Sequence, residues 1–207
     1  MGGGILDRVA GSPAVYDVVQ MLAGYPLLAR RLRQVIGPTT GLAVLDAGAG
    51  TGALEALVHD TGSYVALELD ERKLERLRLH HPHAEVIHGS VTSIPLPNDA
   101  VDIALLVNVA HHLTDDELES ALEELNRVTR TRVIVADPVA DGPLTGRALW
   151  KIDQGAHPRT AEELRAAIDR HLHVEQVGRL TLLHRFALIS AAIRKTPRAE
   201  PHTPAPD

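Results

Sequence analysis

Short apolar runs alternate with amphipathic helical patterns through the middle of the chain. Runs rich in Val, Ile, Leu and Ala, each bounded by polar or glycine-containing segments, predict five strands at residues 41–46, 63–68, 84–88, 101–107 and 132–137. Apolar positions that recur every three or four residues predict helices between them, at 53–59, 71–80 and 115–128. Such alternation is typical of a parallel sheet covered by helices on both faces. We therefore predict an α/β, Rossmann-like, doubly wound fold.

Helical patterns also precede the predicted sheet, at residues 13–22 and 27–36. We expect these two helices to close over the binding site as a lid. Residues 1–40 are accordingly assigned to an N-terminal helical lid and residues 41–194 to the main domain. In the charged helix at 71–80, three leucines are expected to face the sheet: Leu74, Leu77 and Leu79.

The C-terminal part combines a helix with a pair of strands. Thr160 is followed three residues later by Glu163, a capping box that predicts a helix from residue 161 to about His171. Strand-like runs at 173–178 and 184–193 are separated by too short a link for a parallel crossover, so they are predicted to pair antiparallel. The last residues, 195–207, contain four prolines and no apolar periodicity and are expected to be disordered.

Composition narrows the possible functions. With 44% apolar and 23% charged residues, a chain of 207 residues is typical of one globular domain. It has no run of about 18 apolar residues and no signal-peptide pattern at its start, so we expect a cytoplasmic protein without a membrane span. The absence of cysteine excludes disulfides, thiolate metal sites and cysteine nucleophiles. A net charge of −6 and only 2% aromatic residues argue against nucleic acid as a partner.

A glycine-rich turn follows the first predicted strand. The segment Asp46-Ala47-Gly48-Ala49-Gly50-Thr51-Gly52 lies between this strand and the next predicted helix. Glycine allows a sharp turn and a close approach of the backbone to a ligand, and a helix N-terminus presents free N–H groups. Glu68 closes the second strand 20 residues after Gly48, a spacing at which a carboxylate can bind both ribose hydroxyls of an adenosine group. The sequence therefore predicts a nucleoside-type cofactor at the C-terminal ends of the first two strands.

The glycine-rich turn is also open to other interpretations. Residues 48–53 also fit the dinucleotide fingerprint, since alanine is allowed at its last position. Asp46, however, would repel a pyrophosphate and suits an ammonium group, and the chain after the fifth strand is short for a second mononucleotide half. A phosphate-binding Walker loop is excluded because no Lys-Ser/Thr pair follows the glycines. The remaining alternative is a structural turn that binds no ligand.

Several segments, taken in order, resemble the motifs of the class I S-adenosylmethionine-dependent methyltransferases, in particular their small-molecule, type 11-like group. Residues 44–52 are similar to the first motif, 66–70 to the second and 88–91 to the third. Residues 95–102 resemble the approach to the fourth strand, and 108–113 the segment after it. Ser90 departs from the family pattern, because it stands where an aspartate often accepts from the adenine amino group.

The resemblance implies a seven-stranded sheet, mostly parallel with an antiparallel last strand, and S-adenosylmethionine as the cofactor. It places Glu68 at the ribose, while Asp46 is expected to bind the ammonium group of the cofactor's amino acid tail. The expected cofactor-binding residues are Tyr16, Asp46, Ala47, Gly48, Gly50, Gly52, Glu68, Leu69, Ser90, Val91 and Asn108.

Methyl transfer from a sulfonium requires chiefly the alignment of donor and acceptor, and a base only when the acceptor must lose a proton. The resemblance places the methyl group near the ends of the fourth and fifth strands. Three histidines in this region are the candidate catalytic bases: His111, His112 and His157. Each has a structural or solvated histidine as its alternative, and Asp137, which ends the fifth strand, is interpreted as ordinary loop polarity.

The acceptor is the least defined part of the prediction. Leu144, Leu149 and Trp150 could form an apolar wall of its pocket or simply pack a short helix. We expect methyl transfer to oxygen, nitrogen or carbon of a small, largely apolar molecule, as in natural-product biosynthesis. The alternative is a protein that binds the cofactor but promotes another reaction, such as cyclisation. No metal site is predicted, since the dense histidines after the charged helix lack spaced carboxylates and are interpreted as a solvated cluster: His80, His81 and His83.

Overall fold

The computed structural model describes residues 25–142, 157–182 and 185–194. Some predictions fall on other residues and so lie outside the described part of the chain. They concern the helix at 13–22 with Tyr16, the tail at 195–207, and the proposed pocket wall of Leu144, Leu149 and Trp150.

One sheet of seven strands forms the centre of the molecule, in the order β3-β2-β1-β4-β5-β7-β6. The strands are β1 (Ala43–Ala47), β2 (Ser63–Glu68), β3 (Glu85–His88), β4 (Val101–Val107), β5 (Thr129–Val139), β6 (Leu172–Thr181) and β7 (Arg185–Ile193). The first five pair in parallel, and β7 is antiparallel to both β5 and β6. The predicted sheet with an antiparallel last strand is therefore confirmed.

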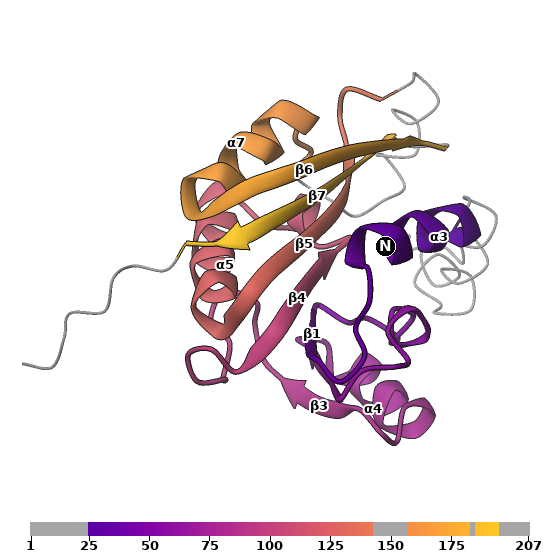
Figure 1. Cartoon of the computed structure of the whole chain (residues 1–207). Helices are drawn as coiled ribbons and strands as arrows, with labels where there is room; N and C mark the ends of the chain where they lie inside the picture. Colours follow the sequence, from indigo (N-terminus) through magenta and orange to yellow (C-terminus); the bar gives the residue numbers. More distant parts are fainter. Residues whose placement is uncertain (1–24, 143–156, 183–184, 195–207) are drawn as a thin grey trace, which may run out of the picture.

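Helices cover both faces of this sheet (Figure 1). The α-helices are α3 (Tyr25–Ile36), α4 (Glu71–His80), α5 (Asp115–Val128) and α7 (Ala161–His171), and two short 3-10 helices are η1 (Glu55–Leu57) and η2 (Ala110–His112). Leucines of α5 and α7 pack into the hydrophobic core on one face. Leucines of α3 and α4 pack into a second core on the other. None of the helices among the described residues has the length and apolar character needed to span a bilayer.

The helix starts follow from local sequence chemistry. Thr114 with Glu117, and Thr160 with Glu163, form reciprocal capping boxes at the first turns of α5 and α7. In each box the hydroxyl accepts an N–H of the first turn while the glutamate accepts the N–H of the threonine, so two otherwise unpaired donors are satisfied. Both caps place helix N-termini beside the C-terminal ends of β4 and β5.

Two sequence predictions were wrong in detail. The helix predicted at 53–59 is only the 3-10 turn η1. Residues 60–62 instead pair with the segment before β1: the Gly62 N–H donates to the Leu42 carbonyl at 2.8 Å, and Thr61 forms a bridge with Thr40, so the chain leaves the helical path early. Leu79 is 75% exposed, whereas Leu74 and Leu77 are buried. At about 100° per residue, position 79 turns away from the face that the other two share.

Candidate active site

The glycine turn lies at the C-terminal edge of β1, between β2 and the segment that follows β4. Gly48, Gly50 and Gly52 have φ angles of +82°, +59° and +85°, which other residues rarely adopt. The Gly48 N–H donates to the Leu67 carbonyl at 2.8 Å, which fixes the turn to β2. A methyl group added at Gly48 would lie 2.5 Å from Cγ2 of Val109, so this glycine permits close packing on the segment after β4. The strand ends predicted to form the cofactor site are therefore in contact.

Glu68 binds the glycine turn directly. Its buried carboxylate accepts the Gly50 N–H at 2.7 Å, and the N–H groups of Leu69 and Asp70 at 3.0 and 2.9 Å. A carboxylate offers about four acceptor positions, so further donors such as ribose hydroxyls can be accommodated. A Cβ added at Gly50 would meet nothing within 4 Å, and the Leu69 side chain beside Glu68 is 64% exposed. The Glu68 carboxylate is thus bordered by open space at Gly50 and by the apolar side chain of Leu69, and a bound nucleoside needs both.

Asp46 is enclosed more tightly than the sequence suggested. It is 1% exposed, and its carboxylate accepts a hydrogen bond of 2.5 Å from the Tyr64 hydroxyl. Burial raises the pKa of Asp46 to about 7; the Tyr64 hydrogen bond lowers it and the Glu68 charge raises it. Contact between Asp46 and a cofactor ammonium group stays a prediction. Tyr64 was not predicted as part of the site, because its position near Asp46 follows only from the pairing of β2 with β1, in which it lies opposite Val44.

The remaining predicted cofactor residues lie along the same edge. Ser90 follows β3, and its hydroxyl is 2.8 Å from that of Thr92, while Val91 is buried. Asn108 follows β4 with a φ of +57°, and its N–H donates to the Ala136 carbonyl at 2.9 Å. The contacts of Ser90 and Asn108 hold these loops in shape, and their roles toward adenine and the amino acid tail stay predictions.

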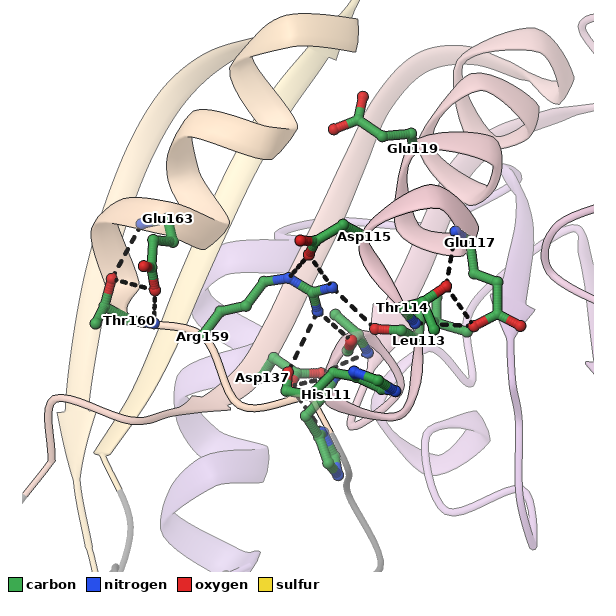
Figure 2. Close-up of polar contacts among 12 residues, drawn as sticks. His111, Leu113, Thr114, Asp115, Glu117, Glu119, Asp137, Arg159, Thr160 and Glu163 are labelled. Carbon is green, nitrogen blue, oxygen red and sulfur yellow. Dashed lines mark hydrogen bonds and ion pairs between the residues drawn. The ribbon is translucent and has the colours of Figure 1, made fainter.

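A buried carboxylate organises the segment after β4 (Figure 2). Asp137, at the end of β5, accepts the N–H groups of Val109, Ala110 and His111 at 2.9 to 3.1 Å. The same carboxylate is 2.7 Å from Nδ1 of His111. Asp137 is 1% exposed and His111 4%, so these contacts are shielded from water. The interpretation of Asp137 as ordinary loop polarity was wrong, because this side chain holds η2 against β5.

The Asp137 contact assigns the tautomer of His111. A neutral imidazole that donates from Nδ1–H to a carboxylate carries its basic lone pair on Nε2. His112 is exposed, with its ring centroid 4.0 Å from that of His111, and His157 donates its backbone N–H to the His111 carbonyl at 3.0 Å. The three predicted histidines therefore lie together. The His111 ring contacts the buried carboxylate of Asp137, whereas His112 is exposed to solvent.

Arg159, which the sequence analysis did not identify, ties η2 to the two capped helices (Figure 2). Its guanidinium donates to the carbonyls of Ala110 and Leu113 at 2.8 and 2.9 Å, and to Asp115 at 2.6 Å. Only 11% of its side chain is exposed. Three acceptors on one planar group fix the position of the segment that carries His111 and His112. Nothing in the local sequence distinguishes Arg159 from a solvated arginine.

Comparisons with known proteins agree with this geometry. Residues 44–132 match a family described as "Methyltransferase domain". A malonyl-acyl carrier protein O-methyltransferase of Serratia marcescens is 33% identical over 183 residues, which cover 84% of this chain and 69% of the relative. One of the same name from Pectobacterium atrosepticum is 34% identical over 140 residues, which cover 67% of this chain. The chain spans about half the length of that relative, 53%.

Among solved structures, a SAM-dependent methyltransferase from Aquifex aeolicus has the same fold. Its TM-score is 0.63 at 23% identity, with 80% of this chain and 89% of that chain covered. The sequence relatives, the matched domain and the strand order point the same way. The chain belongs to the class I S-adenosylmethionine-dependent methyltransferases, in their type 11-like group.

Proposed function

We propose that this chain transfers the methyl group of S-adenosylmethionine to an oxygen atom of a small, largely apolar acceptor. The observation that carries the proposal is the 2.7 Å contact between Asp137 and Nδ1 of His111, at the same sheet edge as the glycine turn. S-adenosylmethionine is the cofactor of the family, and it supplies a methyl group that its positively charged sulfur already activates for displacement.

The residues of the chain fit this cofactor. Glu68 has acceptor capacity for the ribose hydroxyls, and the open space at Gly50 admits a ligand against the backbone. Leu69 offers an exposed apolar side chain beside the adenine position, and Asp46 offers the carboxylate for the ammonium group. Holding donor and acceptor in line can contribute about 7–11 kcal/mol to such a displacement.

The need for His111 depends on the acceptor. A hydroxyl group must lose its proton as it attacks, and Nε2 of His111 is the basic nitrogen that would take it. A base in this role contributes roughly 10²–10⁴-fold in rate. A malonyl group, which the names of two relatives mention, carries a carboxylate that is already ionised near neutral pH and needs no base. The two kinds of oxygen acceptor should therefore respond differently to loss of the histidine.

The test uses methyl-labelled S-adenosylmethionine with two acceptor sets, small apolar alcohols or phenols and malonyl thioesters, free or on acyl carrier protein. With hydroxyl acceptors we expect His111→Ala to lower kcat about 10²–10⁴-fold and to remove the acidic limb of the pH profile, because a general base acts only in its unprotonated form. With carboxylate acceptors the loss should be much smaller. His59→Ala, which changes an exposed histidine outside this segment, is the matched control.

Binding of S-adenosylhomocysteine without label transfer to any acceptor of either set would contradict the proposal. That result would support the alternative of a cofactor-binding protein with another reaction, such as cyclisation, since this fold does not determine one activity.

A further inference from the structure

His81, at the end of α4, lies against the glycine turn. Its N–H caps the helix by donating to the Leu77 carbonyl, while its ring extends to two other elements. Nδ1 pairs with a carboxylate oxygen of Glu55 in η1, and Nε2 is 3.1 Å from the carbonyl oxygen of Thr51. The His81 side chain is 20% exposed and that of Glu55 27%. The interpretation of this histidine as part of a solvated cluster was therefore wrong, although His80 and His83 are indeed exposed.

Contact between the ring and the turn is close. A methyl group added at Gly52 would lie 2.5 Å from Nε2 of His81 and 2.8 Å from Cδ2 of Leu77. The third glycine of the turn thus lies directly on the histidine ring and the α4 leucine. Any movement of this ring must be accommodated by the Thr51–Gly52 backbone.

Both partners of the ring are hydrogen-bond acceptors. A carboxylate and a carbonyl oxygen each need an N–H from the ring, and a neutral imidazole has only one. Only the imidazolium form satisfies both at once. In the neutral form, one ring nitrogen presents its lone pair to an acceptor oxygen, which is unfavourable. Among the described residues Glu55 is the charged group recorded against the ring, while Arg78, His80 and His83 nearby are exposed.

We propose that His81 is a positioning residue for the cofactor: in its imidazolium form it joins Thr51 to Glu55 and holds the glycine turn in the binding conformation. Protonation of His81 and binding of the cofactor then favour each other. The inference rests on the proposed function, because it assumes that the turn receives the cofactor.

The test measures the dissociation constant of S-adenosylhomocysteine by calorimetry between pH 5.5 and 8.5. The variants are His81→Gln and Glu55→Gln, with His80→Gln and His83→Gln as controls that remove neighbouring exposed histidines. We expect His81→Gln to bind about tenfold more weakly than wild type at pH 6 and nearly equally at pH 8.5, as for one lost charged hydrogen bond. Glu55→Gln should follow the same trend, and the controls should stay within twofold of wild type. Each variant is compared with wild type at the same pH, so the effect of Asp46 titration on affinity is common to both and cancels.

Ring ¹⁵N shifts of His81 give a second readout that does not depend on any variant. Near pH 7, S-adenosylhomocysteine should move the ring toward imidazolium, and the rings of His80 and His83 should not change. The inference would be overturned if the affinities of Glu55→Gln and His81→Gln relative to wild type do not change with pH, or if the ligand leaves the His81 ring shifts unchanged. Either result would leave the proposed function intact. If His81→Gln does not fold, the affinity of Glu55→Gln and the ring ¹⁵N shifts of His81 in the wild type test the inference. Failure of the wild type to bind S-adenosylhomocysteine would overturn both the proposed function and this inference.

Discussion

Glu68 occupies the meeting point of three backbone N–H groups, so its charge orders the turn before any ligand binds. Glu68→Ala removes both this support and the acceptor expected for the ribose. We expect the binding free energy of S-adenosylhomocysteine to weaken by roughly 1–3 kcal/mol, the range for polar groups left without partners. Calorimetry measures this affinity, with Glu71→Ala, at an exposed position in the first turn of α4, as a charge-matched control. If the two variants bind S-adenosylhomocysteine with equal affinity, Glu68 is not part of the cofactor site.

Asp46 makes a different prediction, because its burial opposes its charge. The pKa of Asp46 in the folded protein is about 7. Between about pH 4 and pH 7 the folded protein therefore keeps a proton on Asp46 that the unfolded chain has already lost. Stability is therefore expected to fall as pH rises from about 4 to 7, and the full penalty applies above pH 7. Asp46→Asn should be more stable than wild type by up to about 4 kcal/mol at pH 8 and equal near pH 4.

The same substitution should weaken cofactor binding, since an amide cannot pair with an ammonium group as a carboxylate does. Urea denaturation at the two pH values and calorimetry measure both effects on one protein. A variant that is less stable than wild type at pH 8 would contradict the burial argument. Stability and binding are thus expected to change in opposite directions at this residue.

At the scale of elements, three glycines with positive φ, one before β1 and two in the glycine turn, are needed for different reasons. Gly41, Gly50 and Gly52 all have positive φ, but a Cβ at Gly41 or Gly50 meets nothing within 4 Å, whereas one at Gly52 meets the His81 ring. We expect Gly41→Ala to cost about 1–2 kcal/mol in unfolding free energy from backbone strain alone. Gly50→Ala should cost a similar amount, and Gly52→Ala clearly more.

Cofactor affinity should rank these variants differently. Gly41→Ala should bind S-adenosylhomocysteine like wild type, while Gly50→Ala should lose at least about tenfold, because its Cβ enters the space left for the ligand. Thermal unfolding and calorimetry on the three variants provide both rankings. Unchanged affinity of Gly50→Ala would place the ligand elsewhere.

Element types followed from local signals. The helices at 71–80 and 115–128 and the strands at 63–68 and 101–107 have the bounds predicted for them, since apolar period and end caps agree there. The helix expected at 53–59 is reduced to η1, since residues 60–62 pair with residues 40–42, and no local pattern records this pairing. Similarly, β5 is longer than predicted, because Thr129 and Val139 join it through pairing with β4 and β7.

At the scale of the whole molecule, the edge of the sheet that carries the glycine turn and the opposite edge have different functions. Asp102, near the start of β4, accepts the Ala43 N–H at 2.8 Å and the Arg130 guanidinium at 2.7 Å. These partners hold the pKa of Asp102 below its usual value, the Ala43 bond contributing most, although partial burial opposes them. Asp102 therefore joins β1, β4 and β5 at the edge opposite the glycine turn.

Asp102→Asn should lower the unfolding free energy by about 0.5–1.5 kcal/mol at pH 7. A depressed carboxyl pKa stabilises the fold above the unfolded value of about 3.9 and loses this effect as pH falls through the folded value, so the difference should vanish in acid. Affinity for S-adenosylhomocysteine should stay within twofold of wild type. Asp60→Asn, at an exposed position, is the control, and an affinity loss in Asp102→Asn would show that the two ends are coupled.

The sequence by itself determined the strand and helix alternation, the glycine turn, Glu68 and the family, because these depend on period, spacing and residue type along the chain. Only the tertiary structure decided which polar groups became partners: Tyr64 for Asp46, Asp137 and Arg159 for the segment of His111, and Glu55 for His81. These pairs join residues 18 to 49 positions apart, so they exist only after the strands have paired. Burial then gives them the strength that the same side chains lack in water.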